Sequence, residues 1–302
     1  MALDQVTGGG VARATANATI AARLWSFLRH QPLIAAAVMV FLVVVLAAIF
    51  APLLSPYPPN QPHIMARLAP PGSESFLLGT DGQGRDMLSR LIFGTRTSLA
   101  LGLVPVSVGA VIGLILGCAA AYLGRVVDVL VMRGLDVFFG LPPVLLAILV
   151  AACLGPGLLN MLVAITIVII PPMSRIAYQN VLMVKELPFI EAARASGAGS
   201  FKILVRHVVP GTLPPIIAYG TSLSGLMIVF GAGLSFVGLG IQPPTADWGR
   251  MINDGRIVLP IAPHVATLPG IAIFALASAF NILGDALRDI LDPRARIRGL
   301  RA

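Results

Sequence analysis

Six apolar stretches separated by shorter polar segments dominate the pattern of this sequence. A helix that crosses the hydrocarbon core of a bilayer needs about 20 mostly apolar residues, and the stretches are close to that length. Because backbone exposed to lipid must satisfy its own hydrogen bonds, the pattern predicts an all-α integral membrane protein with six transmembrane helices. The predicted spans are residues 33–54, 99–123, 137–154, 158–173, 213–239 and 261–283.

Two details refine this pattern. A Gly-Pro-Gly turn at 155–157 separates the third and fourth spans, so these two spans should form a helical hairpin, and the fourth has an alternative end beyond Pro171-Pro172. A cleaved signal peptide has an apolar core of about 7–15 residues near the N-terminus. The first apolar run is longer and begins only after residue 32, which favours a retained membrane anchor at 33–54.

Composition supports a membrane protein and argues against a nucleic-acid-binding one. Hydrophobic residues make up 57% of the chain and charged residues 11%, whereas a soluble domain carries about 25% charged residues. The net charge of +8 comes from basic residues scattered between apolar blocks, as in membrane loops, and not from one basic patch. Cys118 and Cys153 both lie inside apolar runs, which favours neither a disulfide nor a metal site.

The distribution of basic residues predicts the orientation in the membrane. Placing both termini in the cytoplasm puts most of the 21 Lys and Arg residues on the cytoplasmic side, as the positive-inside rule requires. The predicted organisation is a cytoplasmic tail (1–32), a first span (33–54), an extracytoplasmic loop (55–96), a five-helix core (97–283) and a cytoplasmic tail (284–302).

The largest predicted cytoplasmic loop, residues 185–212, contains the small and polar stretch EAARASGAGS at 191–200. Pro188 suits the first turn of a helix, and Gly197 suits a left-handed helix end. Ser200 is placed to cap a second short helix, which Pro210 and Pro214-Pro215 should keep from continuing into the fifth span. The residues alone leave two interpretations open: an amphipathic helix on the membrane surface, or a site where a partner docks closely.

The same stretch resembles the EAA loop of permease subunits of bacterial ABC importers. Residues 191–193, 197 and 210 match its Glu-Ala-Ala, Gly and Pro positions, and histidine at 207 is similar to the peptide and nickel branch. The resemblance implies that this loop docks on a cytoplasmic ATPase and transmits its motion to the membrane helices. The implied coupling residues are Glu191, Ala192, Ala193, Arg194, Gly197, His207 and Pro210.

Three more segments, at 77–99, 234–252 and 280–294, resemble the second permease of the dipeptide, oligopeptide and nickel importers. The resemblance implies the type I ABC importer permease fold and a bacterial inner-membrane location. It also implies a second homologous permease, two ATPase subunits that bind ATP and Mg²⁺, and an extracytoplasmic solute-binding protein. It leaves the substrate open among dipeptides, longer peptides, glutathione-like peptides, nickel chelates and some sugars or opines.

Polar motifs in the predicted outer segments have competing interpretations. The stretch DGQGRD at 81–86 begins like a calcium loop, but the twelfth position holds Ile92 where an EF-hand needs a glutamate. A glycine-rich turn ordered by Asp–Arg pairing is therefore favoured. Trp248 is expected either to anchor the chain at the membrane interface or to contact a delivery protein. The candidate binding-protein or outer-loop contacts are Asp81, Arg85, Asp86 and Trp248.

Small residues inside the spans suggest close helix packing or a solute path. Gly109, Gly113 and Gly117 repeat every fourth residue of the second span, a spacing that lets helices approach closely. In the fifth span the candidate path-lining residues are Ser222, Ser224 and Ser235, with tight packing as the alternative. Asp128, Arg133 and Asp136 cluster at the start of the third span, where mutual ion pairing is expected.

The sequence argues against an enzyme. A P-loop needs a lysine after a glycine, and the only lysines, Lys185 and Lys202, follow Val184 and Phe201. No HExxH zinc motif is present, and the four histidines are spread singly. No cofactor is therefore expected on this chain. An ion-coupled carrier would place charges at mid-membrane, where this chain has few, and a membrane scaffold would leave the serine-rich fifth span unexplained.

Overall fold

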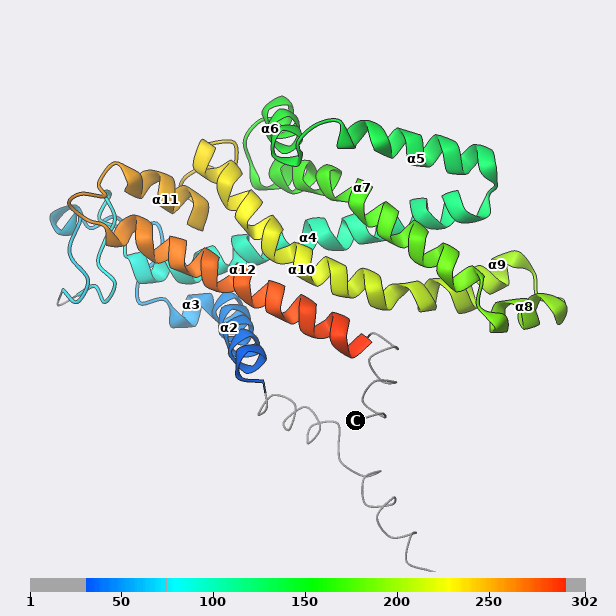
Figure 1. Cartoon of the computed structure of the whole chain (residues 1–302). Coiled ribbons are helices and arrows are strands. Elements are labelled where there is room, and N and C mark those ends of the chain that lie inside the picture. The colour runs from blue at the N-terminus through cyan, green and yellow to red at the C-terminus, as the bar shows by residue number, and fades with distance from the viewer. Residues whose placement is uncertain (1–30, 74, 292–302) are drawn as a thin grey trace, which may run out of the picture.

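The computed structural model describes residues 31–73 and 75–291, so most of both predicted terminal tails lies outside the described residues. Within them the regular structure is helical, apart from two isolated β-bridges (Figure 1). The elements are α2 (Pro32–Ile49), α3 (Ala51–Leu54), η1 (Ile64–Ala66), α4 (Met87–Tyr122), α5 (Arg125–Phe139), α6 (Pro143–Leu154), α7 (Leu158–Lys185), α8 (Pro188–Ala195), α9 (Ser200–Ile203), η2 (Leu204–Val208), α10 (Val209–Val237), α11 (Trp248–Arg256) and α12 (His264–Leu291).

Among the described residues, five helical segments are long and apolar enough to cross a membrane. They are α2, α4, α7, α12 and the continuous run through α9, η2 and α10. The predicted third span at 137–154 is not one continuous helix, because α5 ends at Phe139, α6 begins at Pro143 and the two helices are bent by 90°. Pro142 and Pro143 account for the bend, since proline lacks an N–H and disfavours helix in the residue before it. The six predicted spans thus become five helices and one broken pair.

Other proline pairs do not end their helices. Pro171-Pro172 lies inside α7, which continues to Lys185, well past the predicted end at 173. The prediction that Pro210 and Pro214-Pro215 would separate the loop helix from the fifth span is also wrong, because helical structure runs from Ser200 to Val237. Pro210 is the second residue of α10 and directly follows the π-helical turn η2, which joins the two parts of this continuous helix.

Helices α4 and α7 form the most extensive contact of the bundle, and glycines on α4 let the two helices approach closely. A Cβ atom added at Gly109, Gly113 or Gly117 would lie 2.7 Å from an atom of α7. At Gly113 the crowded atoms include the backbone nitrogen of Ser174. The predicted use of these glycines, close packing against another span, is confirmed within this chain.

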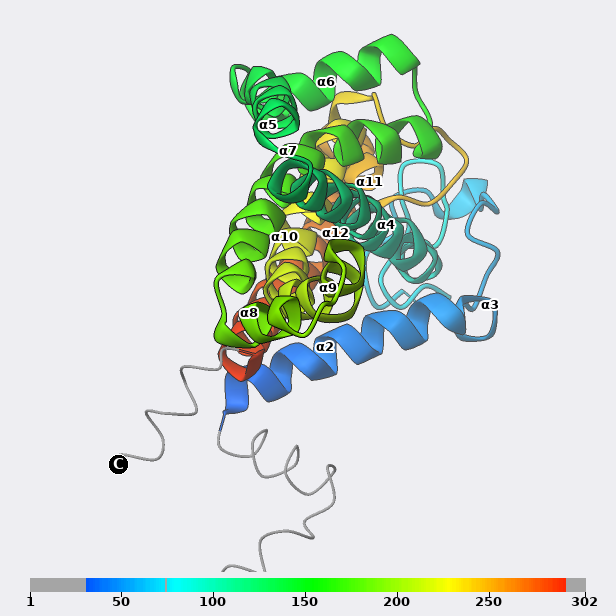
Figure 2. The same cartoon turned by 90° about the vertical axis from the view of Figure 1, so that its right-hand side faces the viewer.

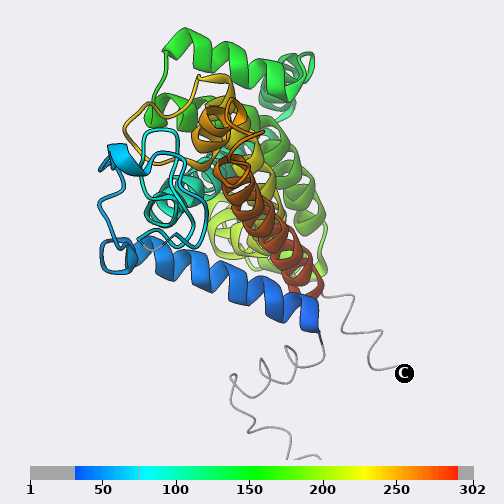
Figure 3. The ribbon, with the colours of Figure 1, turned by 90° about the vertical axis from the view of Figure 1, so that its left-hand side faces the viewer.

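The long helices α4, α7, α10 and α12 run side by side, and α2 lies along their flank (Figures 1 and 2). Helices α5 and α6 lie over α7 on another side of the bundle (Figure 2). The 55–86 segment and α11 gather at one end, which faces the viewer in Figure 3, while α8 and α9 lie at the opposite end. The predicted functional segments are therefore separated by the length of the bundle.

Candidate functional site

The segment 185–212, here called the coupling loop, folds as two short helices that meet at Gly197. Gly197 has φ +80°, and its N–H donates to Arg194 O at 2.9 Å. The N–H of Ala198 donates to Ala193 O at 3.1 Å. These two bonds and the left-handed glycine form a Schellman motif, which satisfies carbonyls at the end of α8. The predicted stop at Gly197 is confirmed.

One face of α8 is buried against the membrane helices and the other is exposed. Ile190 is fully buried in a cluster with Cys118 of α4, Val181 of α7 and Val208 of η2. Glu191, Ala192 and Arg194 are exposed, as is Gly197, while Ala193 is half-buried. The loop thus presents a surface of small side chains with one acid and one base.

The remaining predicted coupling residues lie beside this surface. The imidazole of His207 is half-buried and stands 6.1 Å, centroid to centroid, from the exposed ring of Phe189. Pro210 is exposed. The prediction that Ser200 caps the second helix is wrong, because Gly199 holds the N-cap position and no side chain caps α9. A glycine cap costs little relative to serine, which makes the two residues hard to tell apart from sequence.

The first residue of the coupling loop, Lys185, binds to the end of α4. Lys185 Nζ donates to the carbonyl oxygen of Ala121 at 2.6 Å, and the same ammonium lies 4.7 Å from the centroid of the Tyr122 ring. Both partners belong to the last turn of α4, where a helix exposes unpaired carbonyls that favour a cation. The loop is therefore held by α4 as well as by the chain continuity with α7 and α10.

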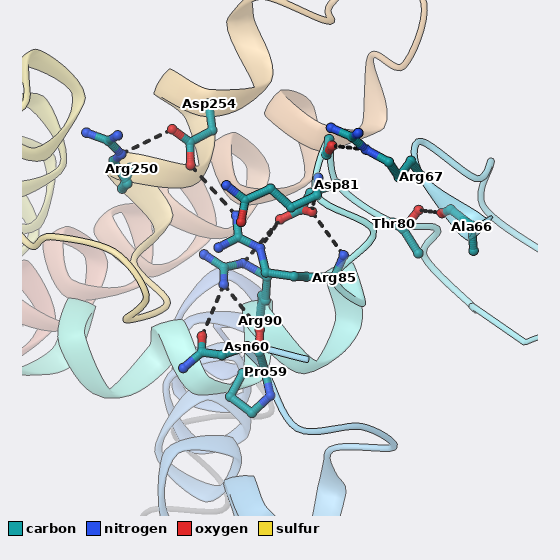
Figure 4. A network of polar contacts seen from close by, with 12 residues as sticks. Pro59, Asn60, Ala66, Arg67, Thr80, Asp81, Arg85, Arg90, Arg250 and Asp254 are labelled. Atoms are coloured by element: carbon teal, nitrogen blue, oxygen red, sulfur yellow. Dashed lines mark hydrogen bonds and ion pairs between the residues drawn. The ribbon is translucent and has the colours of Figure 1, made fainter. Parts of the chain in front are cut away.

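At the other end of the bundle, the DGQGRD stretch forms the turn that its sequence predicts. Asp81 Oδ1 accepts from the backbone N–H groups of Gln83 at 2.8 Å and Arg85 at 3.0 Å. Its Oδ2 accepts from Arg85 Nε at 2.6 Å (Figure 4). One carboxylate thus orders both the backbone and the side chain of the turn, as predicted by the Asp–Arg pairing.

The network around this turn reaches further than sequence reasoning found (Figure 4). Arg90 of α4 lies with its Nε 3.6 Å from Asp81 Oδ2 and donates to Pro59 O at 3.2 Å. On α11, Asp254 lies 3.9 Å from Arg85 and 3.1 Å from Arg250. The i, i+4 spacing of Arg250 and Asp254 was a usable signal, but their tie to Arg85 depends on the tertiary fold.

Asp81, Arg85, Asp86 and Trp248 were expected to contact a binding protein or the outer loops. Their burial fits contacts within the outer segments and not direct contact with a binding protein, because each is 5% exposed or less. Asp86 caps α4 by accepting from Ser89 N at 2.8 Å. The indole of Trp248 donates to Leu91 O at 3.0 Å and occupies the space left by Gly94. Trp248 is equally not an interfacial anchor, since it packs inside the chain. These residues shape the 55–86 segment from within.

Asp247 begins α11 and is almost fully buried. Its carboxylate accepts from Arg250 N at 2.9 Å, which satisfies the first turn of the helix. Burial raises the pKa of this carboxyl above its usual 3.8, while the hydrogen bond from Arg250 N opposes the rise.

The three candidate path serines of α10 lie in different surroundings. Ser224 is buried and lines a hollow of about 310 Å³ between α4 and α10. Ser222 faces Gly284 of α12, where an added Cβ would lie 2.1 Å from the Ser222 hydroxyl. Ser235 is fully buried and accepts from Ile241 N at 3.4 Å. For Ser222 and Ser235 the structure supports the alternative of tight packing.

The charged cluster on α5 pairs partly as predicted. Asp136 forms ion pairs with Arg133 at 3.8 Å and with Arg175 of α7. Asp128 instead accepts a hydrogen bond from the Tyr178 hydroxyl at 3.0 Å. These contacts tie α5 to α7. In the part of the chain that the structure describes, no three His, Cys, Asp or Glu side chains gather as ligands for a metal ion.

Comparison with known proteins identifies related chains over nearly the whole length. Residues 109–297 match the family described as binding-protein-dependent transport system inner membrane component. Residues 19–71 match the N-terminal TM domain of oligopeptide transport permease C. The chain is 43% identical over 270 residues to the glutathione transport system permease protein GsiD of Pectobacterium atrosepticum, covering 89% of each. It is 42% identical over 272 residues to GsiD of Escherichia coli O6:K15:H31, covering 90% of each.

Solved structures share the fold. The inward-facing MetNI methionine ABC transporter aligns with a TM-score of 0.55 at 22% identity, over 68% of this chain and 98% of that chain. A crystal structure of an amino acid ABC transporter with histidines aligns with a TM-score of 0.52 at 16% identity, over 67% and 94%. Together with the family match, these findings place the chain among the binding-protein-dependent inner membrane components, the permease subunits of ABC importers.

Proposed function

We propose that this permease forms half of the translocation path for a peptide-like solute and is driven by an ATPase that docks on the coupling loop. The relatives are glutathione permeases, which makes glutathione or another short peptide the first solute to test. The second permease would be a homologous chain, and two ATPase subunits would bind ATP and Mg²⁺. A solute-binding protein would deliver the solute at the α11 end.

The observation that carries this proposal is the construction of the coupling loop. Its exposed face offers small side chains that permit close approach, and its buried face, through Ile190, packs against α4 and α7. Interiors this well packed transmit displacement instead of absorbing it. A force applied to α8 would therefore reach α4, α7 and α10 together.

The proposed orientation follows from the same geometry. The coupling loop would face the cytoplasm, where ATP is available, so both termini would be cytoplasmic and the 55–86 segment would face outward. The distribution of Lys and Arg supports the same orientation. Alternating access would then consist of the bundle changing its arrangement around the solute path as the ATPases close.

Site-specific photocrosslinking in native membranes tests the docking. A benzoylphenylalanine residue at Ala192, which is exposed on α8, should crosslink to a P-loop ATPase. The matched control is Met65 at the opposite end of the bundle, which is fully exposed and should give no ATPase adduct. Equal ATPase adducts from both positions, or none from Ala192, would contradict the proposed docking surface.

A further inference from the structure

Two hollows follow one another along the face that α7 and α10 share. The first hollow, about 430 Å³, is lined by apolar side chains including Phe139, Pro172, Leu226 and Phe230. The second hollow, about 590 Å³, lies nearer the coupling loop and is lined by residues including Asn180, Gly211 and Arg288. Both volumes fall in the range of about 300–1,000 Å³ that is usual for small-molecule sites. Tyr219 of α10 lines both hollows and therefore stands between them.

Each hollow is also lined by a residue whose carbonyl has lost its helical partners. In α7, Pro171 and Pro172 stand three and four residues after Val168, which lines the first hollow. In α10, Pro214 and Pro215 stand three and four residues after Gly211, which lines the second. Because proline has no N–H, neither carbonyl has an α-helical or a 3₁₀ donor. Such carbonyls can accept from the N–H groups of a solute.

The second hollow carries a positive charge. Arg288 of α12 is exposed, and none of the ion pairs among the described residues includes it. Its acidic neighbours on the same helix, Asp285 and Asp289, line a different hollow beside α2. The side-chain amide nitrogen of Asn180 donates a hydrogen bond to Ile176 O at 2.8 Å, and its side-chain oxygen is available as an acceptor. Arg288 therefore lines this hollow while Asp285 and Asp289 line another, and Asp292, four residues on, lies outside the described residues.

We propose that the two hollows are successive binding sites along the solute path. Tyr219 is the barrier between them, and Arg288 is the group that binds a solute carboxylate. The inference rests on the proposed function, which it deepens by naming the chemistry of the path. A guanidinium binds a carboxylate through charge-assisted and often bidentate hydrogen bonds. A short peptide with a free carboxylate offers both that anion and N–H donors for the carbonyls of Val168 and Gly211.

A helix of the second permease is the competing occupant of this face. Covering a guanidinium and unpaired carbonyls with an apolar helix would leave polar groups buried without partners, which is costly. Water and a polar solute leave them solvated. The second hollow should therefore remain open to water in the assembled importer.

Cysteine labelling in the assembled importer tests the charge of the second hollow. In a background with Cys118→Ala and Cys153→Ser, the variant Asn180→Cys is treated with an anionic sulfonatoethyl or a cationic trimethylammonioethyl methanethiosulfonate. The anionic reagent should react faster by on the order of tenfold, and Arg288→Gln should remove the difference. Thr221→Cys is the matched control, because its hollow is lined without any charged residue and should not distinguish the reagents.

The barrier is tested in inside-out vesicles, where the coupling loop faces the bath. Leu223→Cys, in the first hollow, should react slowly while Tyr219 is present. Tyr219→Ala should expose it, whereas Tyr219→Phe should keep the reaction slow because the ring is retained. Fast labelling of Leu223→Cys behind an intact Tyr219 would overturn the barrier.

The labelling also distinguishes this inference from the proposed function. Equal rates for the two reagents at Asn180→Cys, or labelling in the isolated chain but not in the assembled importer, would overturn the proposed solute-binding site in the second hollow. If the ATPase still co-purifies in those preparations, the proposed function stands and only the path is wrongly placed. Loss of the ATPase from otherwise folded, labelled preparations would contradict the proposed function instead.

Discussion

Replacing Gly197 with alanine isolates the contribution of the coupling loop. Gly197 has φ +80°, a conformation that residues with a Cβ rarely adopt, and an added Cβ would meet no atom within 4 Å. The substitution therefore strains the backbone without a steric clash. The left-handed conformation costs an L-residue about 1–2 kcal/mol.

That cost converts into a measurable loss of docking. If the ATPase binds only the ordered turn, a loss of about 1–2 kcal/mol reduces the ordered population by up to about 5–30-fold. Asparagine tolerates the left-handed region better than alanine, so Gly197→Asn should retain most of the binding. Gly199→Ser, two residues away, should be nearly neutral because Gly199 has φ −65°, which any residue adopts, and because serine is a good N-cap residue.

The assay is the amount of ATPase retained on the purified permease, together with ATP-driven solute uptake. We expect both to fall for Gly197→Ala, to recover in Gly197→Asn and to be normal for Gly199→Ser, at unchanged membrane insertion. Wild-type docking and uptake by Gly197→Ala would refute the role assigned to the turn. An equal defect in Gly199→Ser would show that small size alone, and not the backbone conformation, matters.

Three further predictions concern stability, measured as thermal unfolding of the purified chain in detergent. Gly113→Ala should lower the stability of the folded chain by about 1–3 kcal/mol through overpacking. Gly134→Ala, with open space around it, should be neutral or stabilising. Equal effects of the two substitutions would contradict close packing at Gly113. Asp81→Asn should lower the stability by about 3–5 kcal/mol because it leaves buried guanidinium groups unpaired. Asp254 is one-third exposed, so Asp254→Asn should lower the stability by about 1 kcal/mol or less. A larger loss for Asp254→Asn than for Asp81→Asn would refute the role of Asp81 as the main partner of these arginines. Because burial raises the pKa of Asp247 above 3.8, its ionisation disfavours folding. Wild-type stability should therefore fall relative to Asp247→Asn as the pH rises above about 4 and through the raised pKa. Parallel pH profiles of the two proteins would contradict that sign.

The sequence predicted the long spans because their signal, about 20 apolar residues in lipid, depends on length and composition alone. The Schellman end at Gly197 was equally local, since only glycine fits that conformation without strain. Proline pairs were not predictable in the same way. The same dipeptide begins α6 at Pro142-Pro143 but lies inside α7 at Pro171-Pro172. Neighbouring helices decide whether a membrane helix tolerates the lost hydrogen bonds, and those neighbours are a property of the fold.

The network at the α11 end shows the same division. The pairing of Asp81 with Arg85 lies within one turn and was predictable from the sequence. The partners Arg90 and Asp254 come from two separate helices, and nothing local joins them to the turn. The burial of Trp248 depends on the space at Gly94, more than 150 residues earlier in the chain. These residues were expected on a contact surface, but in the structure they lie in the interior.

Purification of the tagged chain from native membranes in mild detergent tests whether this permease works as part of an ATP-driven importer. We expect stoichiometric recovery of a P-loop ATPase and a second homologous permease, and ATP-dependent uptake of a short peptide once this complex and its binding protein are reconstituted. Recovery of the chain alone, in a form that moves solute without ATP, would contradict an ATP-driven importer.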